Sequence, residues 1–235
     1  MAIPTIRSVG TVASATGVAT PGWPAGVVAG DLVIMFIETA NQTVSVSGWT
    51  ECPSSPQGTG TTTLGTRLTA YYRTYSVVGD NRATSDSGNH QLAQIIAITA
   101  GTWNTSNPFN TSAGAVDSSA TTSVSIGGVT TTVDDCLLLY GVSGSLPDAN
   151  GTAEFTSWSN GSLSSVNEEI DNTRTSGNGG SLGVASGGLA SLGASGAMTV
   201  TAATSAVRGK ICLAIEPAAA ASASGAGWYG SGMGW

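Results

Sequence analysis

Two stretches of consecutive apolar residues stand out in a chain that is otherwise rich in small polar residues. The first runs from Gly30 to Glu38 and contains Leu-Val-Ile-Met-Phe-Ile after a Gly-Asp pair. It is shorter than the roughly 20 residues that cross a bilayer, and its β-branched and aromatic residues predict a fully buried strand. A similar stretch, Asp134 to Val142, occurs in the second half of the chain. Trp49 follows the first stretch and Trp158 follows the second.

Alternating apolar and polar positions predict further strands between short turns that contain Gly, Asn or Asp. These segments are 5–9, 43–49, 64–76, 91–99, 121–126, 163–171 and 207–217. No segment predicts a helix longer than a turn or two. Short strands of this spacing favour an all-β fold, an antiparallel β-sandwich or jelly-roll-like structure. We therefore expect a single β-sandwich domain over residues 1–217.

The two halves of this domain resemble each other in their order of elements. Each half contains an Asp-led apolar strand, a Trp near a strand end, an amphipathic strand, a Gly-rich turn and a closing apolar strand; residues 207–217 match 91–100 in place and character. This pattern indicates a weak internal pseudo-repeat. The alternative is that the strands of any β-sandwich alternate in this way without a duplication.

Residues 218–235 differ in composition from everything before them, and we call them the C-terminal arm. Ala, Gly and Ser make up most of the arm, and large side chains occur at Trp228, Tyr229, Met233 and Trp235. A segment of small residues does not fold alone, so we expect these four residues to bind a neighbouring subunit, where buried aromatic rings contribute strongly. The alternative is that the arm folds back on its own domain.

The charge of the chain argues against nucleic acid as a partner. The net charge is −7, and the seven basic residues are scattered along the sequence. Binding of a phosphate backbone requires clustered Lys and Arg. Charged residues make up only 9% of the chain, against about 25% in an ordinary soluble domain. The surface is therefore expected to consist mainly of Ser, Thr and Gly.

The sequence predicts neither a secretory leader nor a membrane span. Residues 1–7 lack a basic start followed by an apolar stretch, so we expect a soluble product made in the host cytoplasm. Cys52, Cys136 and Cys212 are an odd number of thiols. Cys136 and Cys212 lie in apolar runs and are interpreted as buried and reduced, with a disulfide between them as the alternative, and Cys52 is placed in a loop.

No convincing catalytic pattern is present, and the chain is predicted not to be an enzyme. His90 is expected to lie in a solvated polar loop near Asp86. A hydrolase triad needs a nucleophile, a His and an acid, but neither Ser143 nor Ser186 lies in a Gly-x-Ser-x-Gly elbow before a helix.

The remaining polar residues predict no cofactor and no metal. Neighbouring carboxylates in a strand point to opposite faces, which argues against a shared substrate at Asp134/Asp135 or Glu168/Glu169. Three dispersed Cys and one His do not form a zinc site, and the Gly-rich runs lack the Lys and helix of a phosphate loop. Exposed Trp rings leave sugar binding as an alternative; the candidate rings are Trp23, Trp103 and Trp158.

Several of these motifs together resemble a widespread group of virion structural proteins of tailed bacteriophages. The motifs are Gly30-Asp-Leu-Val-Ile-Met-Phe-Ile-Glu-Thr-Ala40, Val46-Ser-Gly-Trp-Thr50, Thr130-Thr-Thr-Val-Asp-Asp-Cys-Leu-Leu-Leu139 and Gly177-Asn-Gly-Gly-Ser-Leu-Gly-Val-Ala-Ser186. The resemblance extends over residues 1–217 and excludes the arm. It implies a non-enzymatic, oligomeric component of the virion.

We therefore expect an outer capsid decoration or cement protein that binds neighbouring subunits. Its partners would be further copies of itself and other virion proteins, either the major capsid protein or tail proteins, with no nucleic acid and no membrane. The alternative is a tail, fibre or adaptor component that binds host glycans during attachment.

Overall fold

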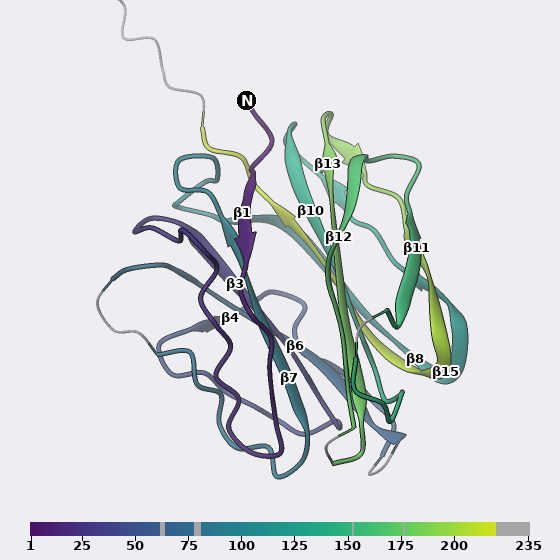
Figure 1. The fold of residues 1–235 in the computed structure, drawn as a ribbon. Coiled ribbons are helices and arrows are strands. Elements are labelled where there is room, and N and C mark those ends of the chain that lie inside the picture. Colours follow the sequence, from purple (N-terminus) through teal and green to yellow (C-terminus); the bar gives the residue numbers. More distant parts are fainter. Residues whose placement is uncertain (62–63, 78–80, 152, 176, 220–235) are drawn as a thin grey trace, which may run out of the picture.

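The computed structural model describes residues 1–61, 64–77, 81–151, 153–175 and 177–219. Two antiparallel β-sheets lie face to face over a common core (Figure 1). The described residues contain no α-helix. The predicted all-β sandwich is therefore confirmed.

The first sheet is built by the first half of the chain and has seven strands. Its main order is β1-β7-β3-β6-β4, with β2 beside β7 and β5 beside β6. The strands are β1 (Ile6–Val9), β2 (Ala13–Ala15), β3 (Leu32–Thr39), β4 (Thr50–Glu51), β5 (Gln57–Thr59), β6 (Thr66–Thr74) and β7 (Gln91–Ile98).

The second sheet is built by the second half and has six strands in the order β11-β15-β10-β13-β12, with β8 beside β15. A two-stranded sheet of β9 and β14 adjoins it. The strands are β8 (Phe109–Ile126), β9 (Thr130–Thr131), β10 (Cys136–Gly144), β11 (Phe155–Ser159), β12 (Ser164–Arg174), β13 (Gly180–Leu189), β14 (Gly193–Ala194) and β15 (Met198–Ile215).

The two apolar stretches occupy equivalent central positions. β3 lies between β7 and β6 in one sheet, and β10 lies between β15 and β13 in the other. β7 and β15, the closing strands of the two halves, both pair antiparallel with the central strand. The two tryptophans break this correspondence: Trp49 precedes β4, which pairs with β6, whereas Trp158 lies in β11, which pairs with β15.

Both faces of each central strand are buried, which explains why their sequences do not alternate. Leu32, Ile34 and Phe36 point into the core between the sheets. Val33 and its neighbours of the same parity pack instead against loop residues on the outer face of the first sheet. In the second sheet, β8 and β15 extend past a bend and cover the outer face of β10, where Tyr140 is buried.

The Asp that leads the first apolar stretch connects three segments of the first sheet. Asp31 is fully buried, and its carboxylate accepts hydrogen bonds from Arg7 Nε at 2.7 Å and from two backbone amides, those of Val28 and Ala100. Burial acts against the charged form, but Arg7 and the two amides outweigh it and hold the pKa of Asp31 below its usual value. Gly30 precedes it with φ of 92°, a conformation that favours glycine.

The two long sides of the sandwich differ. On one side, β5 closes against β8 and β15: Ser54 Oγ lies 2.8 Å from Ser112 Oγ, and a Cβ at Gly209 would lie 2.3 Å from the Gln57 carbonyl oxygen. On the other side, β1 is the outer strand of the first sheet and β12 that of the second. A groove separates these two strands.

Candidate functional site

A buried polar cluster, the Glu38 cluster, closes one end of the core between the sheets. Glu38, at the end of β3, lies 2.7 Å from His90 Nε2 and accepts a hydrogen bond from Thr66 Oγ1 at 3.0 Å. Thr66 Oγ1 also lies 2.9 Å from Oγ of Ser143, which belongs to the opposite sheet. The prediction that His90 is a solvated loop residue is wrong, because His90 is fully buried.

Burial and the short contact together set the protonation of this pair. Burial raises the pKa of Glu38 despite the opposing charge of His90. Burial acts to lower the pKa of His90, but the Glu38 carboxylate outweighs it, so the pKa of His90 is raised. The pair therefore holds a proton more firmly than either residue would in water. Nδ1 of His90 has no hydrogen-bond partner among the described residues.

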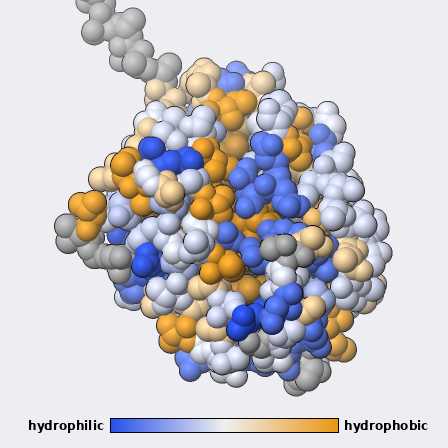
Figure 2. Space-filling model, in the orientation of Figure 1, coloured by the Kyte–Doolittle hydropathy of each residue, from blue (hydrophilic) through white to orange (hydrophobic). Residues whose placement is uncertain are grey.

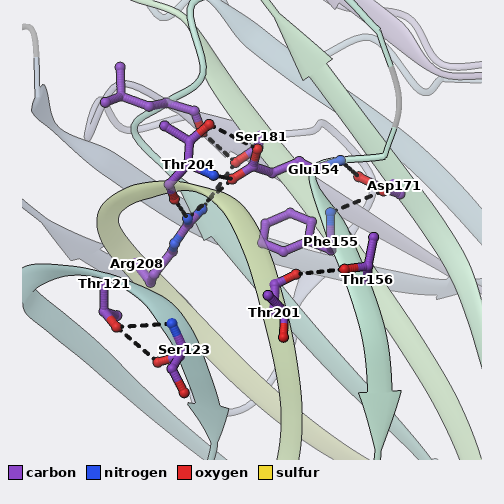
Figure 3. Close-up of polar contacts among 11 residues, drawn as sticks. Thr121, Ser123, Glu154, Phe155, Thr156, Asp171, Ser181, Thr201, Thr204 and Arg208 are labelled. Atoms are coloured by element: carbon purple, nitrogen blue, oxygen red, sulfur yellow. Dashed lines mark hydrogen bonds and ion pairs between the residues drawn. The ribbon is translucent and has the colours of Figure 1, made fainter.

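Figure 3 shows a second buried polar cluster, the Arg208 cluster. Arg208 pairs with Gly144 of β10, which follows Ser143 of the Glu38 cluster. Arg208 on β15 is 0% exposed, and its Nη2 lies 3.2 Å from Oε1 of Glu154, which is 2% exposed. The guanidinium also donates to the carbonyl oxygen of Thr204 and, at 3.4 Å, to Ser181 Oγ. It lies 5.3 Å from the centre of the Phe155 ring. Burial lowers the pKa of Arg208 despite the nearby carboxylate.

Asp171 on β12 lies beside this cluster and accepts hydrogen bonds from the backbone at the start of β11. Its two carboxylate oxygens accept the backbone N–H groups of Glu154 and Phe155, each at 3.1 Å (Figure 3). Burial is the main cause that raises the pKa of Asp171 to about 6, and the charge of Glu168 contributes.

The adjacent residues Glu168 and Glu169 have different hydrogen-bond partners, but both line one shallow pocket with Asp171, so their predicted separation on opposite faces is not confirmed. Glu168 accepts a hydrogen bond from Trp158 Nε1 at 2.8 Å, whereas Glu169 accepts one from Ser186 Oγ at 2.6 Å. The two carboxylates therefore have separate partners. Asp134 serves as a turn residue before β10, as expected: its Oδ1 accepts the backbone N–H of Leu192 at 2.8 Å.

The ionisable side chains of both buried clusters bind other residues of the same chain. Neither His90 nor Arg208 is accessible to a substrate, because both side chains are fully buried. No group of three or more His, Cys, Asp or Glu that could hold a metal ion occurs within the described ranges. The Glu38 cluster connects the two sheets, the Arg208 cluster connects segments of the second half of the chain, and neither provides an open catalytic centre.

Of the three tryptophans suggested for sugar binding, Trp103 is enclosed by protein, whereas Trp23 and Trp158 are half-buried. Trp103 is 2% exposed and donates to the carbonyl oxygen of Gly30 at 3.3 Å, so the prediction of an exposed platform is wrong there. Trp23 stacks on Trp49 with ring centres 6.0 Å apart, and the guanidinium of Arg82 lies 5.4 Å from its ring centre. Trp158 is half-buried at the surface of β11.

All three cysteines are free and buried. The expected burial of Cys136 and Cys212 is confirmed, whereas Cys52 is more deeply buried than its predicted loop position suggested. Burial raises the pKa of Cys136 to about 11 and that of Cys212 to about 12, and it raises the pKa of Cys52 well above its usual value. All three thiols are therefore protonated and unreactive near neutral pH.

The groove between β1 and β12, which we call the edge groove, is an accessible feature of the described surface. It has a volume of about 710 Å³, within the range of ligand sites in proteins. Ile3, Ile6 and Val9 of the β1 segment are only partly buried and contact the central core. Figure 2, which has the orientation of Figure 1, shows an apolar strip with hydrophilic residues beside it on this face of the molecule. The other lining residues include Leu137, Ser164, Asn167, Glu169, Gly187 and Gly188.

Polar contacts mark both ends of the edge groove. At one end the N-terminal amine of Met1 lies 3.0 Å from Asp135 Oδ2. At the other, Asn172 Nδ2 donates to Gln94 Oε1 at 2.7 Å and so connects the two sheets. Between them the floor depends on glycine: a Cβ at Gly188 would lie 2.8 Å from Cδ1 of Ile3. The absence of a side chain at Gly188 therefore lets Ile3 of the β1 segment pack closely against β13.

The four residues predicted to bind a partner, Trp228, Tyr229, Met233 and Trp235, lie outside the described residues. Within the described part of the chain, no helix has the length and apolar character of a membrane span. No protein-family model matches this chain, and neither does any curated protein sequence or any solved structure.

Proposed function

We propose that this chain is a non-enzymatic structural protein of a tailed-bacteriophage virion, an outer decoration or cement protein that binds neighbouring subunits. The observation that carries the proposal is the location of its reactive groups. His90, Glu38, Arg208 and Glu154 are all buried in contacts between strands. The motifs shared with virion structural proteins support the bacteriophage setting.

The surface supports a role on the outside of a particle, away from packaged DNA. The chain has a net charge of −7 and a single lysine, Lys210. That lysine is largely buried, and its Nζ lies 2.6 Å from Asp117 Oδ1. A surface with few available cations binds a phosphate backbone poorly. Contacts with neighbouring subunits would instead use apolar residues and strand edges.

The proposal is tested on purified particles of a bacteriophage that encodes the chain. Mass spectrometry of the particles should detect this chain together with the major capsid protein, and cryo-electron microscopy should place it over the outside of the head. Absence of the chain from particles that contain the other head and tail proteins would overturn the proposal. Density confined to the tail would favour the alternative tail, fibre or adaptor role.

One observation favours a glycan-binding role for such a tail component. A shallow pocket of about 520 Å³ is lined by the acidic residues Glu168, Glu169 and Asp171, and the half-buried Trp158 donates to Glu168 beside it. Aromatic rings and carboxylates are the groups that stack on sugars and accept their hydroxyls. Oligosaccharide binding that is lost in Trp158→Ala and kept in Trp49→Phe would support this role, and lack of binding by the unmodified chain would exclude it.

A further inference from the structure

The edge groove has the features of a site for an extended peptide. Its β1 wall is an outer strand that pairs with β7 and has no second strand partner among the described residues. Ile3, Ile6 and Val9 present partly buried apolar side chains along it. An outer strand beside an apolar groove is a surface to which another chain can add by backbone hydrogen bonding, with pockets for alternate side chains.

The sequence beyond the described residues contains a segment of matching chemistry. Residues 228–235 read Trp-Tyr-Gly-Ser-Gly-Met-Gly-Trp. Its large side chains are separated by Gly and Ser, which add little bulk where two backbones approach. Trp and Tyr combine a large apolar ring with a polar group that seeks a partner, and the groove supplies acceptors at Asn167 and Glu169.

The described chain ends close to this groove. Ala218 donates its backbone N–H to the carbonyl oxygen of Thr102 at 3.0 Å. The hydroxyl of Thr102 accepts the backbone N–H of Thr5 at 3.3 Å, and Thr5 lines the groove. From Ala219 to Trp228 the chain can extend about 30 Å, at roughly 3.3 Å per residue. The segment can therefore reach a groove at some distance from its own attachment point.

The direction of the chain favours the groove of another molecule. Pro217 pairs antiparallel with Trp103, so the chain continues the line of β15 past the level of Leu137 and Gly188. These two residues lie at the end of the groove that adjoins Met1. The last described residues and the N-terminus lie at the same end of the sandwich (Figure 1). Entry into its own groove would require the chain to reverse at this rim, whereas continuation leads to a neighbour.

We infer that the edge groove binds residues 228–235 of a second copy of this chain. Trp228 or Trp235 would occupy the apolar wall formed by Ile3 and Ile6, and the Gly-rich backbone would lie along the free edge of β1. Each copy would give one segment and accept another, which suits a symmetric oligomer. The inference rests on the proposed subunit-binding role, and it does not depend on the bacteriophage setting.

The test compares full-length variants by sedimentation velocity over micromolar to millimolar protein concentrations. Ile3→Gln alters the groove and leaves the segment intact, whereas Trp228→Ala with Trp235→Ala alters the segment and leaves the groove intact. Each is expected to weaken self-association at least about tenfold, as loss of a central apolar or aromatic contact does. Val18→Gln is the matched control, because Val18 is 53% exposed and lies outside the groove.

A mixing experiment gives the decisive result. The groove variant still carries a normal segment, and the segment variant still carries a normal groove. Equal amounts of the two should form a one-to-one complex in which a single segment occupies a single groove, although neither variant self-associates at that concentration. Far-UV circular dichroism checks that Ile3→Gln is folded; if it is not, Thr5→Arg at the exposed rim replaces it.

Several results would overturn the inference. These are a monomeric unmodified chain over the whole concentration range, self-association of the groove variant equal to that of the unmodified chain, and absence of a complex on mixing. The first result would indicate that the segment binds its own groove or none. Because all measurements use the purified chain, failure here is separate from the particle test, which could still find the chain on virions.

Discussion

Replacement of Glu154 by Gln tests whether the Arg208 cluster holds the second sheet together. The change keeps the size of the side chain and removes its charge. The Gln oxygen can still accept from the backbone N–H of Thr204, which donates to Glu154 at 3.2 Å. The same oxygen, Ser181 Oγ and the Thr204 carbonyl oxygen would remain as neutral acceptors for Arg208, but its carboxylate partner would be lost. The substitution therefore isolates the cost of an uncompensated buried cation.

The magnitude follows from the burial of the pair. Arg208 is 0% exposed and Glu154 is 2% exposed, so water cannot solvate the cation once its partner is neutral. Removal of one partner of a buried ion pair costs about 3 to 5 kcal/mol. The retained hydrogen bonds favour the lower value, which is a large part of a total stability of about 5 to 15 kcal/mol. At about 2 to 4 °C per kcal/mol for a chain of this size, Tm should fall by roughly 6 to 12 °C.

A second substitution should partly reverse the first. In Glu154→Gln with Arg208→Met, no buried cation remains, and the Met side chain fills the space of the arginine stem beside Phe155. Replacement of both members of a buried pair by neutral groups is often close to neutral in free energy. The double variant is therefore expected to be more stable than Glu154→Gln alone by about 2 kcal/mol.

The assay is equilibrium unfolding in urea, followed by tryptophan fluorescence and circular dichroism. Glu51→Gln is the matched control, because Glu51 is exposed, and its effect should stay within about 0.5 kcal/mol. The reasoning is refuted if Glu154→Gln costs less than about 1 kcal/mol, or if the double variant is no more stable than the single one.

Three further predictions follow from other buried groups. His90 is the only histidine, so its NMR signal is unambiguous: it should titrate above about 6.5 in the unmodified chain and at a lower pH in Glu38→Gln, where burial is opposed only by the charge of Asp148. The stability contributed by protonated His90 is accordingly full below about pH 6.5 and is lost as pH rises through its raised pKa; an unchanged titration in Glu38→Gln would contradict the assignment. Because the pKa of Asp171 is raised to about 6, stability should fall as pH rises from about 4 to about 6, and Asp171→Asn should remove this dependence in pH-dependent urea unfolding. Trp49→Ala should cost about 3 to 5 kcal/mol, because its ring is 9% exposed and stacked, whereas the half-buried Trp158→Ala should cost clearly less; equal losses would show that the stacked rings do not form a core.

The sequence predicts the central strands well because each contains a run of consecutive apolar residues, Leu32 to Ile37 and Cys136 to Tyr140. Leu32–Thr39 and Cys136–Gly144 are buried throughout, and a short strand of that composition has no stable place except the middle of a covered sheet. The loops that cover the outer faces are harder to predict. Thr69 and Tyr71 lie on the same face of the predicted amphipathic segment 64–76 as its arginines, yet both are buried. The hydroxyl of Tyr71 donates to the Val44 carbonyl oxygen in a covering loop.

The Glu38 cluster shows which signal was available and which was not. Glu38 has the same parity as Leu32, Ile34 and Phe36, which face the inter-sheet core, so a polar residue inside the core was foreseeable. The partner of Glu38 was not foreseeable, because His90 is separated from Glu38 by 52 residues. The sequence predicts only that His90 lies in a loop near Asp86. The sheet register instead brings Thr39 opposite Gln91, which places His90 beside the end of β3.

The use of charge inside the fold bears on where a partner can bind. Of the seven basic residues, Arg7, Arg208 and Lys210 form ion pairs, and Arg73 and Arg82 lie over tryptophan rings, so five are already engaged within the sandwich. A neighbouring subunit with the same acidic balance would be repelled by a surface-to-surface contact based on charge. Apolar burial and backbone hydrogen bonds do not have this cost, and the edge groove offers both. The scarcity of available cations therefore favours the groove over any charged patch as the place where copies of this chain meet.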